Sequence, residues 1–229
     1  MNKQIMTLAA AIGVALLTLP AGAAEARIVS FNSDDGVALS GLWYGEGDEV
    51  VILSHQYDLD QSAWAKVADT LAGQGYGVLT YNFRGYPPSG GKHDIGEIGH
   101  DLAGAIAFAQ AQGATQLILA GASMGGIVTV PAAVTAKPVG YITLSAPLGF
   151  AGLAADDASL LTSPAAKLFI NSEGDQYLPD TQHMFDVASE PKTLEVYPGS
   201  AHAMSMFARK EGPAVQARIV TFINDVMPL

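Results

Sequence analysis

Gly121-Ala122-Ser123-Met124-Gly125-Gly126 sets one serine among small residues. The apolar run 116–120 precedes it and the apolar residues 127–130 follow it. This order predicts a strand, a sharp turn that carries Ser123, and then a helix. Glycines beside such a turn let backbone segments approach where a side chain would clash. The turn would expose the Ser123 hydroxyl at the C-terminal end of a strand, beside the first N–H groups of the helix. A glycine-rich turn with an incidental serine is the alternative interpretation.

Two later segments supply a carboxylate and an imidazole. The apolar strand pattern 167–171 runs into a loop that contains Asp175, and the strand pattern 193–197 runs into a turn that ends at His202. Ser123, Asp175 and His202 therefore follow predicted strands in the order Ser, Asp, His. A nucleophile, an acid and a base in this chain order are typical of one family of hydrolases.

The chain resembles a small α/β-hydrolase of the esterase and dienelactone-hydrolase-like kind. The matching motifs lie in one order along the chain, over nearly all of it after residue 26: residues 53–55 with Trp64, 82–86 with 89–90, 121–126, 174–179 and 199–202. Two residues depart from the usual pattern, since Gln56 stands where the family usually has glycine and Asn82 where it often has aspartate.

The resemblance implies an α/β fold of the α/β-hydrolase type. We expect a mostly parallel, twisted sheet of about eight strands, with helices on both faces and no lid domain. The alternation of strand and helix patterns agrees with a parallel sheet that is covered on both sides. The expected strands are 28–32, 37–44, 50–54, 77–83, 117–121, 139–145, 166–171 and 193–197, with the first two as a hairpin. The expected helices are 62–73, 95–112, 181–188 and 204–226.

Residues 1–26 read as a secretory signal peptide. A short start with Lys3 leads into the apolar run 5–19, and the small residues 21–26 follow Pro20. The run is shorter than the about 20 residues that a spanning helix needs. We expect cleavage after Ala26, with Ala23 and Ala24 as rival sites, and an uncleaved anchor as the alternative. The α/β-hydrolase domain would then be residues 27–229, in the periplasm or secreted, with no stable membrane insertion after cleavage.

Composition excludes several kinds of site. The chain has no cysteine, which excludes a disulfide framework, a thiolate metal site and lipid attachment at a cysteine. Its net charge of −11 argues against nucleic-acid partners. His93, Glu97 and His100 are spaced for one helical face and could bind zinc, but polar residues are ordinary in a first helical turn. We therefore expect no metal and no cofactor.

The three site residues suit acyl transfer. Serine needs an adjacent base to become a nucleophile, so His202 would take the Ser123 proton and pass it to the leaving group. Asp175 would hold the imidazole in the correct tautomer. The backbone N–H of Met124 would be one oxyanion donor, and that of Tyr57, with Gln56 as its rival, the second.

Other polar residues are candidates for the same roles. Glu173 and Asp180 compete with Asp175, and His183 competes with His202, although it falls within a predicted helix. The resemblance implies a bracing role for His55. Arg84 is expected to pin neighbouring loops through its guanidinium group.

The sequence thus favours an exported serine hydrolase that cleaves carboxylic esters or thioesters of small molecules. About twenty residues, 146–165, stand where many relatives insert a helical lid, and we expect only a loop or a short helix there. The alternative function is a non-catalytic exported binding protein on a hydrolase scaffold, because fold alone does not imply activity.

Overall fold

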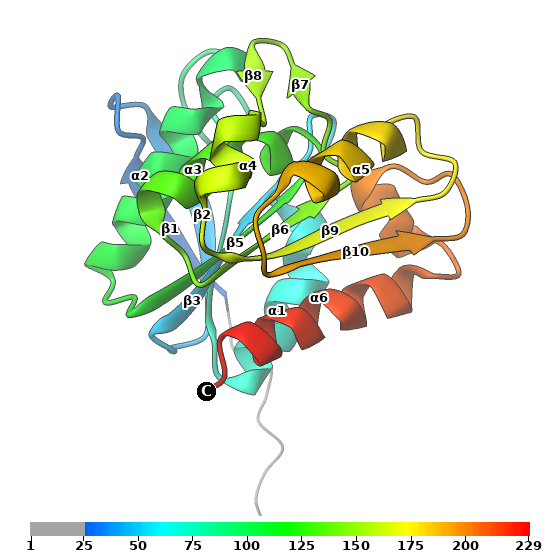
Figure 1. The fold of residues 1–229 in the computed structure, drawn as a ribbon. Coiled ribbons are helices and arrows are strands. Elements are labelled where there is room, and N and C mark those ends of the chain that lie inside the picture. Colours follow the sequence, from blue (N-terminus) through cyan, green and yellow to red (C-terminus); the bar gives the residue numbers. More distant parts are fainter. Residues whose placement is uncertain (1–25) are drawn as a thin grey trace, which may run out of the picture.

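The centre of the fold is an eight-stranded sheet (Figure 1). The structure, a computed structural model, describes residues 26–229. The strands run across the sheet in the order β1 (Arg27–Asn32), β2 (Ala38–Tyr44), β4 (Gly77–Tyr81), β3 (Glu49–Ser54), β5 (Gln116–Ala122), β6 (Gly140–Leu144), β9 (Ala166–Ser172) and β10 (Lys192–Tyr197). β1 and β2 form an antiparallel hairpin, β2 pairs antiparallel with β4, and every other pair is parallel. The expected α/β-hydrolase architecture is confirmed.

Helices cover both faces of this sheet (Figure 1). One face carries α2 (Ile98–Ala111), α3 (Met124–Ala136) and α5 (Leu178–Val187), with the short α4 (Asp157–Thr162) against α3 and α5. The other face carries α1 (Ala65–Gln74) and α6 (Gly212–Val226). Three 3-10 turns complete the set: η1 (Gln61–Trp64), η2 (Ile95–Glu97) and η3 (Ala203–Ala208).

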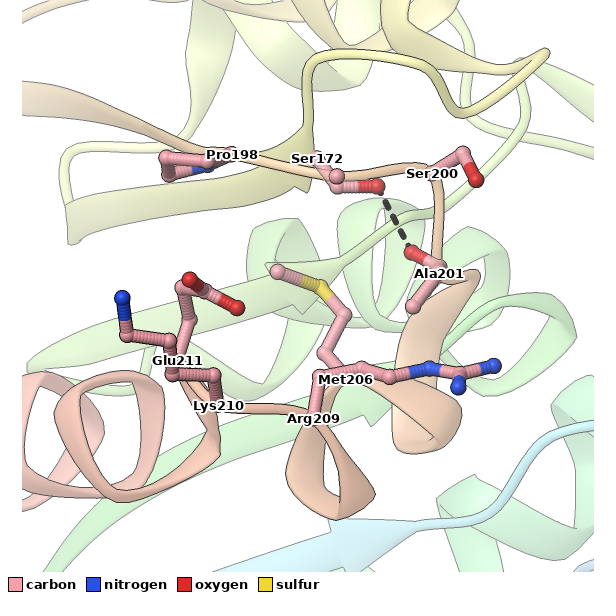
Figure 2. A pocket seen from close by; sticks show the side chains of 9 residues that line it. Ser172, Pro198, Ser200, Ala201, Met206, Arg209, Lys210 and Glu211 are labelled. Atoms are coloured by element: carbon pink, nitrogen blue, oxygen red, sulfur yellow. Dashed lines mark hydrogen bonds between the residues drawn. The ribbon is translucent and has the colours of Figure 1, made fainter.

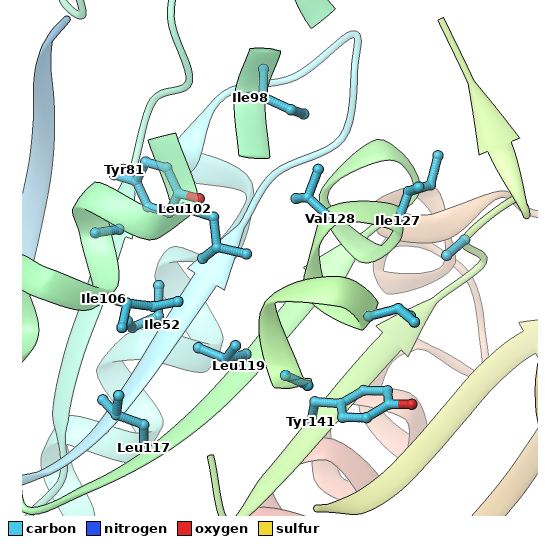
Figure 3. Close-up of a cluster of buried hydrophobic side chains, with 14 of the residues drawn as sticks. Ile52, Tyr81, Ile98, Leu102, Ile106, Leu117, Leu119, Ile127, Val128 and Tyr141 are labelled. Carbon is cyan, nitrogen blue, oxygen red and sulfur yellow. The ribbon is translucent and has the colours of Figure 1, made fainter. Parts of the chain in front are cut away.

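Alternate residues of the central strands enter two separate cores. In β3, Ile52 packs among α2 and α3 side chains, whereas Val51 and Leu53 face α1 and α6. Figure 3 shows the first of these cores, where Ile52 and Leu119 lie near Leu102 of α2. A strand that is buried on both faces must be apolar at every position, which explains the continuous hydrophobic runs in the sequence.

The strand register brings the functional loops together. Ser54, at the end of β3, pairs with Gly121 in β5, and Leu144, at the end of β6, pairs with Ala122. Tyr197 of β10 pairs with Ser172 of β9. The loops that follow these parallel strands therefore leave the sheet at the same edge, where ligands bind in open α/β sheets.

The segment 146–165 departs in part from the expectation of a loop or short helix. It contains α4 but also a two-stranded hairpin, β7 (Gly149–Phe150) with β8 (Leu153–Ala154). Phe150 pairs with Leu153 across the positive-φ residues Ala151 and Gly152. No lid domain stands between β6 and β9, and residues 145–165 are fully within the described part of the chain.

The expectation of one helix over 204–226 is wrong. The structure has η3, a break at residues 209–211, and then α6. Arg209 is extended, with φ −95° and ψ 172°. Pro213 has no N–H to continue a helix from the preceding turn, but it fits the first turn of a new one. The predicted helix over 181–188 begins three residues earlier, at Leu178.

The signal-peptide expectation lies almost wholly outside the described residues, because 1–25 are not described. Within residues 26–229, no helix combines the length and the apolar character that crossing a membrane requires.

Candidate active site

Ser123 stands on a sharp turn between β5 and α3. Its backbone has φ 49° and ψ −117°, a conformation that non-glycine residues rarely adopt. The neighbouring glycines make this turn possible. A Cβ on Gly121 would lie 2.2 Å from the Gly125 carbonyl oxygen, and a Cβ on Gly125 would lie 2.6 Å from that of Ser54. The strain holds the serine out at the strand end, which is where the sequence places a nucleophile.

Three side chains from separate loops form a continuous hydrogen-bond chain. The Ser123 hydroxyl lies 2.9 Å from His202 Nε2, and His202 Nδ1 lies 2.8 Å from Asp175 Oδ2. Asp175 follows β9 and His202 follows β10. With Nδ1–H donating to the carboxylate, Nε2 is free to accept the serine proton. The structure thus brings all three sequence-predicted residues together in the arrangement that general-base activation requires.

The carboxylate of Asp175 is buried and fully partnered. Its side chain is 1% exposed, and its second oxygen, Oδ1, accepts the Tyr177 N–H at 2.9 Å. Burial alone would raise the pKa of Asp175, but the hydrogen bonds from His202 and Tyr177 hold the pKa below its ordinary value. Asp175 therefore remains an anion that can orient and stabilise a protonated imidazole.

The expected oxyanion donors lie beside Ser123. Met124 is the first residue of α3, and Gln56 and Tyr57 follow β3. Within residues 26–229, no hydrogen bond occupies the backbone N–H of Met124, Gln56 or Tyr57. These N–H groups are free to donate to a ligand, and the choice between Tyr57 and Gln56 as second donor stays a prediction.

Ser123 and His202 open into a cavity of about 300 Å³. Its walls come from the loops after β3, β6, β9 and β10: Gln56, Tyr57, Asp58, Ser123, Pro147, Phe150, Gln176, Tyr177, His202 and Ser205. A larger cavity of about 450 Å³ lies between residues 198–201 and residues 209–211, which precede α6 (Figure 2). There Ser172 Oγ donates to the Ala201 carbonyl oxygen at 2.7 Å, which fixes the residue before His202.

The family model described as "Serine aminopeptidase, S33" matches residues 45–171, more than half of the 229 residues. The chain belongs to this family of α/β hydrolases. No curated protein matches the sequence of this hydrolase.

Solved structures share the fold of the hydrolase over most of its length. The esterase Pf2001 of Pyrococcus furiosus is 21% identical, with a TM-score of 0.76 over 89% of this chain and 94% of that chain. XC6422 of Xanthomonas campestris, described as a serine hydrolase without lid, is 19% identical, with a TM-score of 0.74 over 90% and 96% of the two chains. Est1E of Butyrivibrio proteoclasticus, solved with ferulic acid, is 16% identical, with a TM-score of 0.75 over 88% and 100%. Likeness at these identities establishes the fold.

Gln56, the departure from the family's usual glycine, bridges two functional loops of the hydrolase. Its side-chain Oε1 accepts the Met204 N–H at 2.9 Å, and its Nε2 donates to Asp58. Met204 lies two residues after His202, so this side chain ties the loop of the expected oxyanion donor to the histidine loop. The sequence shows the unusual residue but gives no sign of its partner, which is 148 residues away.

His55 and Tyr86 also hold the loop after β3, which carries Gln56 and Tyr57. The buried imidazole lies 2.7 Å from the Gln56 carbonyl oxygen through Nδ1, and its Nε2 accepts the Phe83 N–H at 3.1 Å. The Tyr86 hydroxyl donates to the Tyr57 carbonyl oxygen. Burial lowers the pKa of His55 to about 4, so the ring is neutral and serves as a structural link. These contacts fit the bracing role that the resemblance implied for His55.

The alternative candidates for the acid and base roles, Glu173, Asp180 and His183, make no hydrogen bond with Ser123 in the described residues. Asp180 accepts the Leu148 N–H at 2.9 Å, and His183 is exposed and lies 2.8 Å from Asp157. Glu173 is exposed and makes no side-chain hydrogen bond within the described residues. The structure therefore brings none of the three to Ser123.

Arg84 pins neighbouring loops, as expected. Its guanidinium group donates to both oxygens of Asp35 at 2.9 and 2.7 Å, and its Nε donates to Asp101 at 2.8 Å. Asp35 lies in the β1–β2 turn and Asp101 in α2. The hydrogen bonds from Arg84 hold the pKa of Asp35 well below its ordinary value.

The three residues considered for zinc separate into two places. His100 lies 3.3 Å from Glu97 and also contacts Asp34, at the surface. His93 instead packs its ring 4.6 Å from that of Tyr86. Among residues 26–229, no group of three metal-ligating side chains has the spacing of a metal site.

Proposed function

We propose that this hydrolase is an exported enzyme that cleaves carboxylic esters of small molecules, with thioesters as a second bond type, through Ser123, His202 and Asp175. The proposal rests above all on one observation: the Ser123 hydroxyl lies 2.9 Å from a histidine nitrogen whose partner is a buried carboxylate, in a cavity open to a small ligand. Several of the solved relatives are described as esterases, which agrees with this substrate class.

The chemistry follows from the positions of the atoms. The Ser123 oxygen attacks the acyl carbon while His202 Nε2 takes the hydroxyl proton. The carbonyl oxygen becomes an oxyanion, which the Met124 N–H and the N–H of Tyr57 or Gln56 stabilise. Collapse expels the alcohol, which leaves with the proton from His202. Water then attacks the acyl-enzyme, and His202 again accepts and returns a proton.

Ester hydrolysis is tested by turnover with and without the serine. We expect the protein to release 4-nitrophenol from 4-nitrophenyl acetate and to leave alanine 4-nitroanilide intact. The Ser123→Ala variant should lose the esterase activity by at least about 10³-fold while it keeps its melting temperature. Hydrolysis of the anilide in preference to the ester would show that the enzyme cleaves amides and not esters. Full activity of Ser123→Ala would show that Ser123 is not the nucleophile.

Export rests on the sequence of residues 1–26, with its apolar run and the small residues before Arg27. The test is N-terminal sequencing of the protein from the fraction outside the inner membrane. We expect the mature chain to begin at Arg27. A full-length chain that stays with the membrane would contradict this part of the proposal.

A further inference from the structure

The cavity at Ser123 is lined by aromatic residues and one carboxylate. Three aromatic residues and one proline are among the residues that line it: Tyr57, Phe150, Tyr177 and Pro147. Asp58 is the one carboxylate among the residues of 26–229 that line it. No lysine or arginine lines the cavity in the part of the chain that the structure describes. A carboxylate on a substrate would therefore enter without a cationic partner.

Two of the aromatic side chains meet edge to face at the cavity while much of their surface is open to solvent. The ring centroids of Tyr57 and Phe150 are 5.5 Å apart, with an interplanar angle of 73°. Tyr57 is 47% exposed and Phe150 is 37% exposed. Tyr57 follows β3 and Phe150 belongs to β7, so the pair spans the gap between the two loops. Exposed aromatic surface next to a reactive group favours contact with a flat apolar part of a ligand.

The carboxylate of Asp58 is held in place at this cavity. It accepts a hydrogen bond from Nε2 of Gln56, and Gln56 is itself fixed by the Met204 N–H. Asp58 is exposed, and its charge lies at the wall of the cavity into which Ser123 and His202 open. The net charge of the chain, −11, adds a general repulsion of anions.

From these features we infer that the hydrolase selects compact esters that carry no negative charge, with a flat apolar group against Tyr57 and Phe150, and that Asp58 rejects carboxylate-bearing esters. We expect a compact ester because the cavity volume of about 300 Å³ is at the low end of the range for ligand pockets. The inference rests on the proposed esterase function and names its substrate class.

The test uses three aryl acetates whose para substituents carry different charges. Methyl 4-acetoxybenzoate is neutral, 4-acetoxybenzoate is an anion and 4-acetoxy-N,N,N-trimethylanilinium is a cation. kcat/KM is measured for each with the wild-type protein and the Asp58→Asn variant. The ratio between variants for one ester cancels the intrinsic reactivity of that ester.

We expect Asp58→Asn to raise kcat/KM about fivefold for the anion, to lower it about fivefold for the cation and to change it less than about twofold for the neutral ester. The two charge effects should shrink in 0.5 M salt because screening weakens them. Glu211→Gln is the matched control, since it removes the same charge from a different cavity, which is lined by residues 198–201 and 209–211. Equal changes for all three esters would overturn the charge role of Asp58.

The aromatic contact is tested separately with Phe150→Ala. We expect KM for methyl 4-acetoxybenzoate to rise about tenfold, while KM for methyl acetate, which has no flat group, stays unchanged. Leu161→Ala, which truncates an exposed side chain of α4, should leave both values unchanged. The same loss for both esters would contradict a role in binding a flat group.

Failure of this inference is distinguishable from failure of the proposed function. If a fluorophosphonate labels Ser123 but the wild-type protein prefers the anionic ester, the nucleophile stands and the substrate class is wrong. If neither labelling nor hydrolysis of any ester occurs in a folded sample, the proposed function itself fails.

Discussion

At the scale of single residues, Asp175 depends on its two hydrogen bonds, with His202 and with the Tyr177 N–H. Asp175→Asn keeps the size of the side chain, but an amide nitrogen that donates toward His202 Nδ1 would favour the tautomer with hydrogen on Nε2. That tautomer cannot accept the Ser123 proton. We expect kcat for ester hydrolysis to fall by about 10³- to 10⁴-fold, measured with 4-nitrophenyl acetate.

The melting temperature of Asp175→Asn, followed by circular dichroism, shows whether the variant is folded. Turnover near the wild-type value in a folded variant would contradict the role of Asp175 in orienting His202.

Gln56 is the second residue whose role depends on one contact. Gln56→Ala would leave the buried Met204 N–H without an acceptor, which costs about 1–3 kcal/mol in unfolding free energy. It would also loosen the loop that carries the expected oxyanion donor. We expect kcat to fall about tenfold with KM nearly unchanged, because the loss concerns positioning at the reacting atoms.

The matched control for that change is Gln182→Ala, which removes an exposed glutamine from α5. It should leave kcat and unfolding free energy as in the wild type. A rise in KM alone for Gln56→Ala would show that Gln56 acts on substrate binding and not on the position of the loop.

At the scale of elements, the β5–α3 turn requires close contact between two backbone segments. A Cβ on Gly125 would lie 2.6 Å from the Ser54 carbonyl oxygen and 2.7 Å from that of His55, both at the end of β3. Gly125→Ala should therefore push β3 away from the turn. We expect a melting temperature at least several degrees lower and the loss of most activity.

The control for this change is Gly99→Ala in α2, where a Cβ would meet nothing within 4 Å. Because alanine favours a helix over glycine by about 1 kcal/mol, Gly99→Ala should melt at the same temperature or higher. Similar melting of the two variants would contradict the tight contact at Gly125.

The loops after β3 and β4 are joined through neutral His55, which makes stability depend on pH. Its pKa is about 4 when folded and 6.5 ordinarily, so below pH 6.5 the unfolded chain binds a proton that the folded chain does not. Unfolding free energy should thus fall as the pH drops from about 6.5 to about 4, by up to about 3 kcal/mol from this group.

His55→Gln tests this dependence, since glutamine can accept the Phe83 N–H but does not titrate. Urea unfolding at pH 7.0, 5.5 and 4.5 should show a flatter pH profile for His55→Gln than for the wild type. An unchanged profile for His55→Gln would contradict a lowered pKa of His55 in the folded protein.

Local patterns were sufficient to predict most elements and the order of the site residues. Glycines at 121, 125 and 126 mark the turn because local sterics demand them, and the continuous apolar strands follow from burial on both faces. The break at Arg209 escaped prediction, although Pro213 was its visible signal. The β7–β8 hairpin and the bond from Gln56 to Met204 escaped because both depend on packing between segments, which a single sequence does not display.

At the scale of the whole molecule, the parallel sheet brings the three site residues together. Ser123, Asp175 and His202 are separated by up to 79 residues, yet each follows a strand that ends at the same edge of the sheet. Loops from β3 and β6 complete the cavity at that edge. A reactive serine is therefore a property of the folded chain and should vanish on unfolding.

The reactivity of Ser123 is measured most directly by reaction of the folded protein with a fluorophosphonate, followed by intact mass and peptide mapping. We predict one adduct per chain, on Ser123, with loss of fluoride, and no adduct after unfolding in urea. Ser205→Ala, which changes another serine of the same cavity, should label as the wild type does. An unlabelled but folded protein, or an adduct on another serine, would contradict the account and favour a binding protein on a hydrolase scaffold.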